Sequence, residues 1–118
     1  QSMVYEVVRA ADVERDLGLI FDFLFETALR LEEDAESAFQ RASARIAEIE
    51  TDMEALGKTP HQGTLRPQLG ATIRNVTKRR AIFYFETDDA NQVLRILAVF
   101  FGGQDHETHI LLRLLLPQ

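Results

Sequence analysis

Two histidines near the C-terminus, His106 and His109, are three residues apart, the spacing at which helical side chains can hold a metal ion together. A zinc site needs three or four protein ligands, and the only obvious third ligand is Asp105. His61 stands apart in a loop and is expected to be a solvated surface residue. The chain has no cysteine, glycine-rich phosphate loop, nucleophile elbow or paired-carboxylate motif. These residue types and spacings predict no metal site and no cofactor.

Positive charge is concentrated in one short segment of an acidic chain. Residues 58–80 contain six basic residues and no acidic one, whereas residues 1–57 contain 14 acidic and 5 basic residues. The chain as a whole has a formal net charge of −6. This segregation indicates either a positive surface patch that faces one kind of partner or solvated loop and strand residues without such a role. The six basic residues are Lys58, Arg66, Arg74, Lys78, Arg79 and Arg80.

The length of 118 residues is typical of one domain, which we assign to residues 3–118. Gln1 and Ser2 precede Met3 and are interpreted as an expression remnant. The apolar runs are far shorter than the roughly 18 residues that would span a bilayer, and no signal peptide opens the chain. We therefore expect a soluble, cytoplasmic protein without a membrane partner.

A strand and a first helix are expected at the start of the domain. A β-branched and aromatic run from Val4 predicts a strand that ends near Arg9. Asp12 stands at an N-cap position, and apolar residues at steps of three and four then predict an amphipathic helix of about 20 residues. Three phenylalanines widen its apolar face, either as additional core or as a surface that a partner covers. They are Phe21, Phe23 and Phe25.

A second helix is expected from the N-cap candidate Asp34. Its apolar stripe includes Phe39 and ends before Gly57, a natural residue just past a helix end. The connection between the two helices is short, so residues 12–56 are predicted to form an antiparallel helical hairpin. The acidic residues of both helices are expected to face solvent.

The second half of the chain is predicted to be mainly β-sheet. Residues 71–77, 81–87 and 92–101 are rich in β-branched and aromatic residues and are separated by short turns, which favours an antiparallel meander. Asp105 then caps a short helix, whose Ile110, Leu111, Leu114 and Leu115 are expected to pack back on the domain. The predicted fold is α+β, in the order β-α-α-β-β-β(-α), with the hairpin packed on a small, mostly antiparallel four-stranded sheet.

This layout resembles the RelE/ParE superfamily of toxins from bacterial type II toxin–antitoxin systems, often called plasmid stabilisation proteins. Short patterns in the same order support the resemblance over nearly the whole chain, from Met3 to about Asp105. They are Tyr5-Glu6-Val7-Val8, Ala11-Asp12, Asp16-Leu17, Leu56 before Pro60-x-x-Gly63, Gly63-x-x-Arg66, Gly70-x-x-x-Arg74, Ile82-x-Tyr84 and Ile96-Leu97-x-Val99-Phe100.

The resemblance implies one of two activities. RelE-like members cut messenger RNA on the ribosome without a metal, and here the counterparts of their catalytic residues are Arg66, Arg74, Arg80 and Tyr84. Two of these have an alternative interpretation, Tyr84 as a half-buried sheet aromatic and Arg74 as an ion-pair partner of the acidic hairpin. ParE-like members inhibit DNA gyrase by binding and need no catalytic residue.

One departure from the superfamily favours the gyrase inhibitor. Many members carry a His-Gly-x-Arg-Asp pattern after the last strand, whereas this chain has Phe101-Gly102-Gly103-Gln104-Asp105. Phenylalanine cannot transfer a proton, and glutamine cannot supply a cation to a charged transition state. The long hairpin is also more similar to ParE. We therefore expect a ParE-like gyrase inhibitor, with a RelE-like ribonuclease or an inactive antitoxin-binding member as alternatives.

The resemblance also implies a cognate antitoxin as partner. DNA binding is expected of that antitoxin, since this chain has no helix-turn-helix with a basic recognition helix. Crowding of leucines near the C-terminus predicts that some stay exposed, which favours a homodimer or a toxin–antitoxin heterotetramer. The residues expected to contact a partner are Phe21, Phe25, Lys58, Arg66, Arg74, Lys78, Arg79, Arg80, Leu112 and Leu116.

Overall fold

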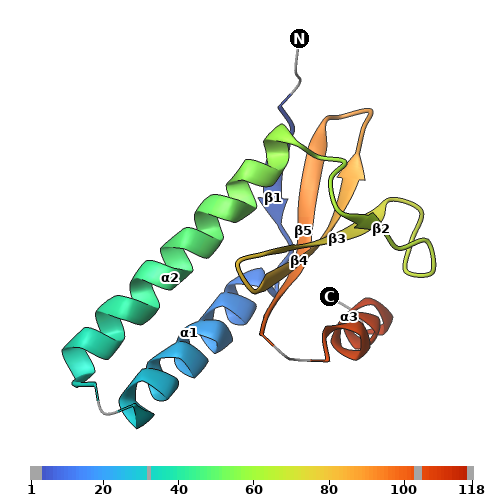
Figure 1. The fold of residues 1–118 in the computed structure, drawn as a ribbon. Helices are drawn as coiled ribbons and strands as arrows, with labels where there is room; N and C mark the ends of the chain where they lie inside the picture. The colour runs from blue at the N-terminus through green and yellow to red at the C-terminus, as the bar shows by residue number, and fades with distance from the viewer. Residues whose placement is uncertain (1–3, 32, 103–104, 117–118) are drawn as a thin grey trace.

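A computed structural model describes residues 4–31, 33–102 and 105–116. It contains a helical hairpin, a five-stranded sheet and a C-terminal helix (Figure 1). Residues 1 and 2, the predicted remnant, lie outside the described part. The elements are β1 (Glu6–Arg9), α1 (Val13–Arg30), α2 (Ala35–Ala55), the 3₁₀ turn η1 (Leu56–Lys58), β2 (Thr64–Leu65), β3 (Ile73–Lys78), β4 (Ala81–Asp88), β5 (Val93–Phe101) and α3 (His106–Leu115).

The strand order in the sheet is β1-β5-β4-β3-β2. The first strand pairs parallel with β5, and all other neighbours are antiparallel. This confirms the predicted α+β class, the order of the main elements and the mostly antiparallel sheet. The prediction of four strands is wrong by one, because β2 has only two residues and so short a strand leaves no alternating pattern in the sequence.

The two faces of the sheet are covered by different helices (Figure 1). The helical hairpin covers one face, and α3 covers the other, where Ile110 is its one buried apolar residue. On the hairpin face the core consists of Tyr5, Ala10, Val13, Leu17, Ile20, Ile49, Met53, Leu56, Ala81, Phe83, Phe85, Leu94, Ile96, Val99 and Phe101. On the α3 face it consists of Ile73, Ile82, Tyr84, Leu97, Ala98, Phe100 and Ile110.

A β-bulge in β5 changes which residues of this strand face each of the two cores. The register between β4 and β5 shifts after Tyr84, which pairs with Ala98, whereas Phe85 pairs with Ile96. Leu97 is thereby the extra residue of a β-bulge. Strict alternation would place Leu97 and Ala98 on opposite faces, but both belong to the α3 core. The bulge therefore allows the consecutive apolar residues of this strand to serve both cores.

The ends of the two long helices agree only partly with the predictions. Asp34 caps α2 as expected, its carboxylate accepting a hydrogen bond from the backbone N–H of Ser37 at 2.8 Å. Asp12 occupies the N-cap position of α1, but its side chain makes no capping bond. Gly57 does not end α2 with a left-handed residue, because the chain continues into η1. It allows close approach instead, since the backbone N–H of Tyr5 donates to the Gly57 carbonyl at 2.8 Å.

The expectation that all acidic residues of the hairpin face solvent is wrong for Asp16. This residue is buried, and its carboxylate accepts hydrogen bonds from the Arg113 guanidinium of α3 at 2.7 and 2.8 Å. It also accepts one from the backbone N–H of Val99 at 3.0 Å. An ion pair therefore connects α1 with α3, and the hydrogen bond from Val99 connects both helices to β5.

None of the helices among the described residues is both long and apolar enough to cross a membrane.

Candidate partner-binding surface

Tyr84, a candidate acid of the ribonuclease alternative, is sealed inside the protein. Its side chain is 1% exposed beneath α3, and its hydroxyl oxygen lies 2.7 Å from Nδ1 of His106. Burial raises the pKa of the Tyr84 hydroxyl, and the charge of nearby Arg66 opposes that increase. In this conformation the hydroxyl is a packed group that is hydrogen-bonded to α3.

The strands distribute the other cationic candidates over different parts of the sheet. Arg74 pairs across the ladder with Phe85 of the hairpin core, whereas Tyr84 and its ladder partner Asn75 face α3. Directly opposed residues share a face, so Arg74 and Tyr84 lie on opposite sides of the sheet. Arg66, whose Nε donates to Oδ1 of Asn75 at 2.9 Å, lies on the Tyr84 side. The structure brings Arg66 close to Tyr84 but does not bring Arg74 to the same site.

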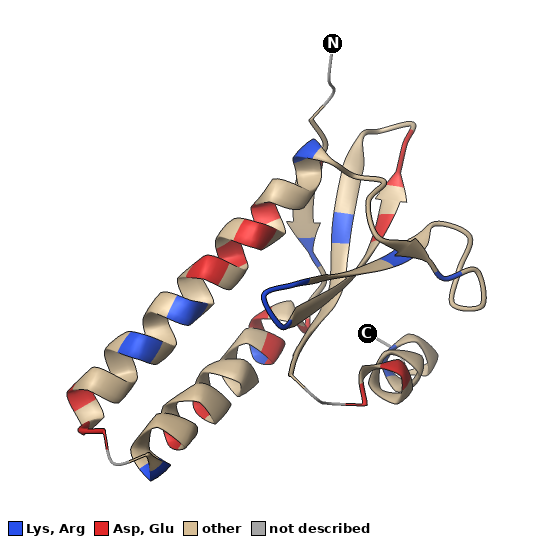
Figure 2. Cartoon of the chain, in the orientation of Figure 1, with Lys and Arg blue, Asp and Glu red and all other residues tan. Residues whose placement is uncertain are grey.

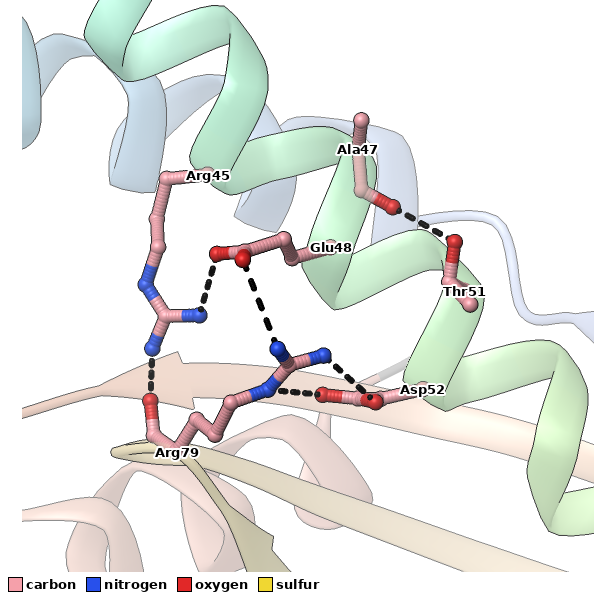
Figure 3. Close-up of polar contacts among 6 residues, drawn as sticks. All are labelled: Arg45, Ala47, Glu48, Thr51, Asp52 and Arg79. Atoms are coloured by element: carbon pink, nitrogen blue, oxygen red, sulfur yellow. Dashed lines mark hydrogen bonds and ion pairs between the residues drawn. The ribbon is translucent and has the colours of Figure 1, made fainter.

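The Arg79 side chain forms its contacts with α2 of the same chain (Figure 3). Its guanidinium donates to both carboxylate oxygens of Asp52 on α2, at 2.9 and 3.2 Å, and to Glu48 at 3.3 Å. Hydrogen bonding to Asp52 raises the pKa of Arg79. Arg45 of α2 hydrogen-bonds the Arg79 carbonyl oxygen. The ion pair that the sequence suggested between Arg74 and the acidic hairpin is thus made by Arg79.

The turn that carries Arg79 and Arg80 has an unusual backbone. Both residues have positive φ, 47° and 73°, as the two central residues of a type I′ hairpin turn require. Asn-Gly or Gly-Gly normally fills these positions, and a left-handed conformation costs other residues roughly 1 kcal/mol or more each. The contacts of Arg79 with α2 hold this strained turn in place. Arg80 is held differently, with its guanidinium 5.2 Å from the centre of the Phe101 ring.

The six cations of residues 58–80 do not form one compact patch (Figure 2). Lys78 ends β3 and is followed by Arg79 and Arg80 in the β3–β4 turn, whereas Lys58 ends η1 and Arg66 follows β2. The turn stands beside the acidic residues of α2 that bind Arg79. The positive charge that remains available to a partner is therefore spread along the sheet margin.

The hairpin carries an aromatic cluster of one exposed and two half-buried rings, which we call the phenylalanine face and define as Phe39, Phe21 and Phe25. The rings of Phe21 and Phe25 stack at 6.0 Å between their centres, and Phe39 of α2 meets Phe21 edge-on at 5.4 Å. Phe39 is 56% exposed, although its position in the apolar stripe predicted an inward side chain. The reason is that the distal half of the hairpin projects beyond the sheet (Figure 1), so its helices have only each other to pack against.

Helix α3 exposes most of its leucines. Only Ile110 is buried, and the predicted inward packing of Leu111, Leu114 and Leu115 is wrong. Leu112 and Leu116, two expected partner contacts, are 51% and 62% exposed. Three turns of helix crossing one sheet face can bury only one narrow stripe. The described residues thus present two apolar surfaces, the phenylalanine face and the outer side of α3.

The histidines of α3 do not combine into a metal site in the part of the chain that the structure describes, where no three histidine or acidic side chains converge. His106 is engaged with Tyr84, and the His109 ring lies 5.8 Å from that of Phe100. His61 is hydrogen-bonded to Asp89 at 2.9 Å between Nε2 and Oδ1. The departure from the superfamily pattern at Gly103 and Gln104 lies outside the described residues.

Acid should loosen α3 through its cap. Asp105 accepts hydrogen bonds from the hydroxyl and the backbone N–H of Thr108, at 2.8 and 3.2 Å, and these bonds lower its pKa below the ordinary 3.8. A lowered pKa means stabilisation that is complete above pH 3.8 and is lost as the pH falls through the value in the folded protein. The protection of the α3 amides against hydrogen exchange, measured relative to their intrinsic rates, should therefore fall below about pH 4. The control is Asp105→Asn, which still caps the helix and should lack this acid dependence.

No protein-family model matches this sequence, and comparison with curated proteins finds no relative. Among solved structures, the chain is similar to a chain of the RelBE2 toxin–antitoxin complex of Mycobacterium tuberculosis, with 17% identity and a TM-score of 0.55 over 88% of this chain and 98% of that one. It is also similar to a chain of the chromosomal ParDE system of P. aeruginosa, with 16% identity and a TM-score of 0.61 over 83% and 96%. The chain therefore shares the fold of these RelE- and ParE-type chains, which confirms the fold that the resemblance implied.

Proposed function

We propose that this chain is the toxin of a type II toxin–antitoxin system, acts in the cytoplasm and is neutralised by a cognate antitoxin. The fold supports this proposal, because both solved neighbours come from toxin–antitoxin assemblies. The phenylalanine face supports it independently. Phe39 is 56% exposed and contacts the half-buried Phe21, which stacks on Phe25, so the hairpin carries an apolar patch of the kind that marks a protein-binding site.

The proposed mode of action is inhibition of DNA gyrase by binding. The observation that carries it is the placement of the ribonuclease candidates. An RNA-cleaving site has to assemble its cations and proton donors around one phosphate, yet Tyr84 is buried and Arg74 lies on the opposite face of the sheet. A binding toxin needs no such assembly, only an exposed complementary surface.

Two assays on the purified chain test this mode of action. The chain should inhibit DNA supercoiling by gyrase and should leave ribosome-bound messenger RNA intact. Arg74→Ala is the discriminating variant, because loss of a phosphate-stabilising cation from a ribonuclease costs on the order of 10² in rate or more. Robust cleavage by the unmutated chain that disappears in folded Arg74→Ala would replace the gyrase proposal with the RelE-like ribonuclease. A chain that neither inhibits gyrase nor cleaves messenger RNA, but still binds the antitoxin, would be an inactive antitoxin-binding member.

The exposed leucines of α3 also support a proposal about assembly. We expect a homodimer of the isolated chain or a toxin–antitoxin heterotetramer, because Leu111, Leu112 and Leu115 of α3 and the following Leu116 are all exposed. Light scattering over a concentration series measures this directly. The prediction would be contradicted if the isolated chain were a monomer at every concentration and its complex with the antitoxin contained one copy of each protein.

A further inference from the structure

A groove between α1 and α3 lies apart from the phenylalanine face. It encloses about 630 Å³, within the size range of ligand-binding clefts. Leu19 and Phe23 of α1 line one side, and Leu112 of α3 and the following Leu116 line the other. Each of these side chains is between 49% and 62% exposed. The walls of the groove are thus apolar surface that the chain itself does not cover.

The charges of the groove are unevenly satisfied. Asp16 binds Arg113 at 2.7 Å, and the Asp12 carboxylate lies 3.8 Å from the same guanidinium. Arg15 and Arg80 also line the groove, and no carboxylate of the described residues lies within ion-pair distance of either. Three arginines against two aspartates leave one positive charge in excess, within a chain whose net charge is −6.

Arg80 is fixed as part of this lining. Its guanidinium stacks over the ring of Phe101, and it stands on the strained β3–β4 turn described above. A residue kept in a left-handed conformation at a cost, when glycine would fit better, indicates that its side chain is used. Asparagine or glycine at this position would relax the turn but would remove the cation from the groove.

From these observations we infer that the groove binds an acidic, leucine-rich or isoleucine-rich segment of the antitoxin. This inference rests on the proposed function. Aliphatic side chains of the segment fill the space between Leu19 and Leu112, and its carboxylates pair with Arg15 and Arg80. Charge complementarity of this kind sets the register of a docked segment and speeds its association.

A second copy of this chain suits the groove less well. The exposed leucines of its own α3 lie within residues 110–116, which contain Arg113 and no acidic residue. Docked in the groove, that segment would leave Arg15 and Arg80 without a carboxylate and would bring another cation close to them. Like charges brought together in an interface oppose association.

Isothermal titration of the chain with the purified product of the adjacent open reading frame tests the inference. We expect Arg15→Glu and Arg80→Glu each to weaken binding at least about tenfold. Arg30→Glu makes the same charge change at an exposed position outside the groove and should weaken binding less than about threefold. Leu112→Ser tests the apolar wall without a charge change and should also weaken binding. In the wild-type complex, amide exchange should slow in α3 and in residues 15–23.

The outcomes separate the inference from the proposed function. If wild-type binding is tight but both arginine variants stay within threefold of it, the groove inference is wrong and the toxin–antitoxin proposal stands. Loss of a dimer in light scattering by these variants, with antitoxin affinity unchanged, would assign the groove to self-association and also overturn the inference. A wild-type chain that neither binds the product nor arrests growth when expressed alone removes the proposed function itself. Circular dichroism melts within 3 °C of wild type, roughly the shift that a stability change of under 1 kcal/mol produces, establish that each variant is folded.

Discussion

Replacing Asp16 by alanine should lower the free energy of unfolding by about 3–5 kcal/mol, because it leaves a partly buried guanidinium without its partner. The Arg113 side chain is only 16% exposed, and it stays charged in the variant because an arginine guanidinium is not deprotonated in proteins. The backbone N–H of Val99 loses its acceptor as well. Urea denaturation followed by circular dichroism measures the loss, and we expect reduced protection of α3 in amide exchange.

Two comparison variants separate pairing from mere removal of an acid. Asp12→Ala removes a carboxylate 3.8 Å from Arg113 that is 43% exposed, and an exposed pair of this kind contributes at most about 1 kcal/mol. The double variant Asp16→Leu with Arg113→Met replaces the whole ion pair by apolar groups, which is often close to neutral. Its remaining loss should be that of the Val99 N–H left without its acceptor, about 1–3 kcal/mol. A loss below 1 kcal/mol in Asp16→Ala, or an equal loss in the double variant, would mean that the pair does not hold α3 to the domain.

Gly57→Ala should be the second severe substitution. A Cβ atom at this position would lie 2.5 Å from the carbonyl oxygen of Tyr5 and 3.0 Å from Cγ2 of Val7. Backbone cannot yield as a flexible side chain does, so the first strand has to move away from η1. Overpacking costs about 1–3 kcal/mol, and the hydrogen bond from the Tyr5 N–H to the Gly57 carbonyl is weakened at a further cost of about 1 kcal/mol.

Gly18→Ala is the matched control for this substitution. Gly18 lies within α1, is exposed, and has open space where a Cβ would be placed. Alanine in a helix interior is more favourable than glycine by roughly 0.5–1 kcal/mol, so this variant should be slightly more stable than wild type. The same chemical change is thus expected to have opposite signs at the two positions. Equal effects in a denaturant titration would contradict the close approach of β1 to η1.

The periodicity of the sequence was sufficient for the helices, the three long strands and the fold class, because apolar spacing reports which side of an element is buried. Periodicity was insufficient where the burial of a residue depends on which other element lies next to it in the fold. Phe39 continues the apolar stripe of α2, yet it is exposed because the sheet ends before the helix does. The bulge at Leu97 depends on pairing with a second strand, and the run of apolar residues in β5 carries no mark of it.

The candidate surfaces were predictable to different extents. Exposed leucines on α3 followed from counting residues per turn, and the departure from the superfamily at Phe101 was visible in the sequence. The Asp16–Arg113 pair was missed, although Asp16 lies three residues after Val13 and four before Ile20, within the buried stripe of α1. An acid at such a position requires a buried partner, which is the signal that identifies it. The opposite placement of Arg74 and Tyr84 required the strand register.

The parallel pairing of β1 with β5 determines when the protein becomes complete during its synthesis. Glu6 pairs with Val93, and Arg9 pairs with Ile96, so β1 cannot pair until β5, which is synthesised later, is available. Helices of the hairpin form locally and early, but the apolar side that they turn toward the sheet stays uncovered until β4 and β5 have emerged. Closing so long a loop is also slow. A nascent chain that has not yet reached β5 therefore carries a helical hairpin whose apolar side the sheet covers only in part, and exposed apolar surface of this kind makes a partly folded chain prone to aggregation.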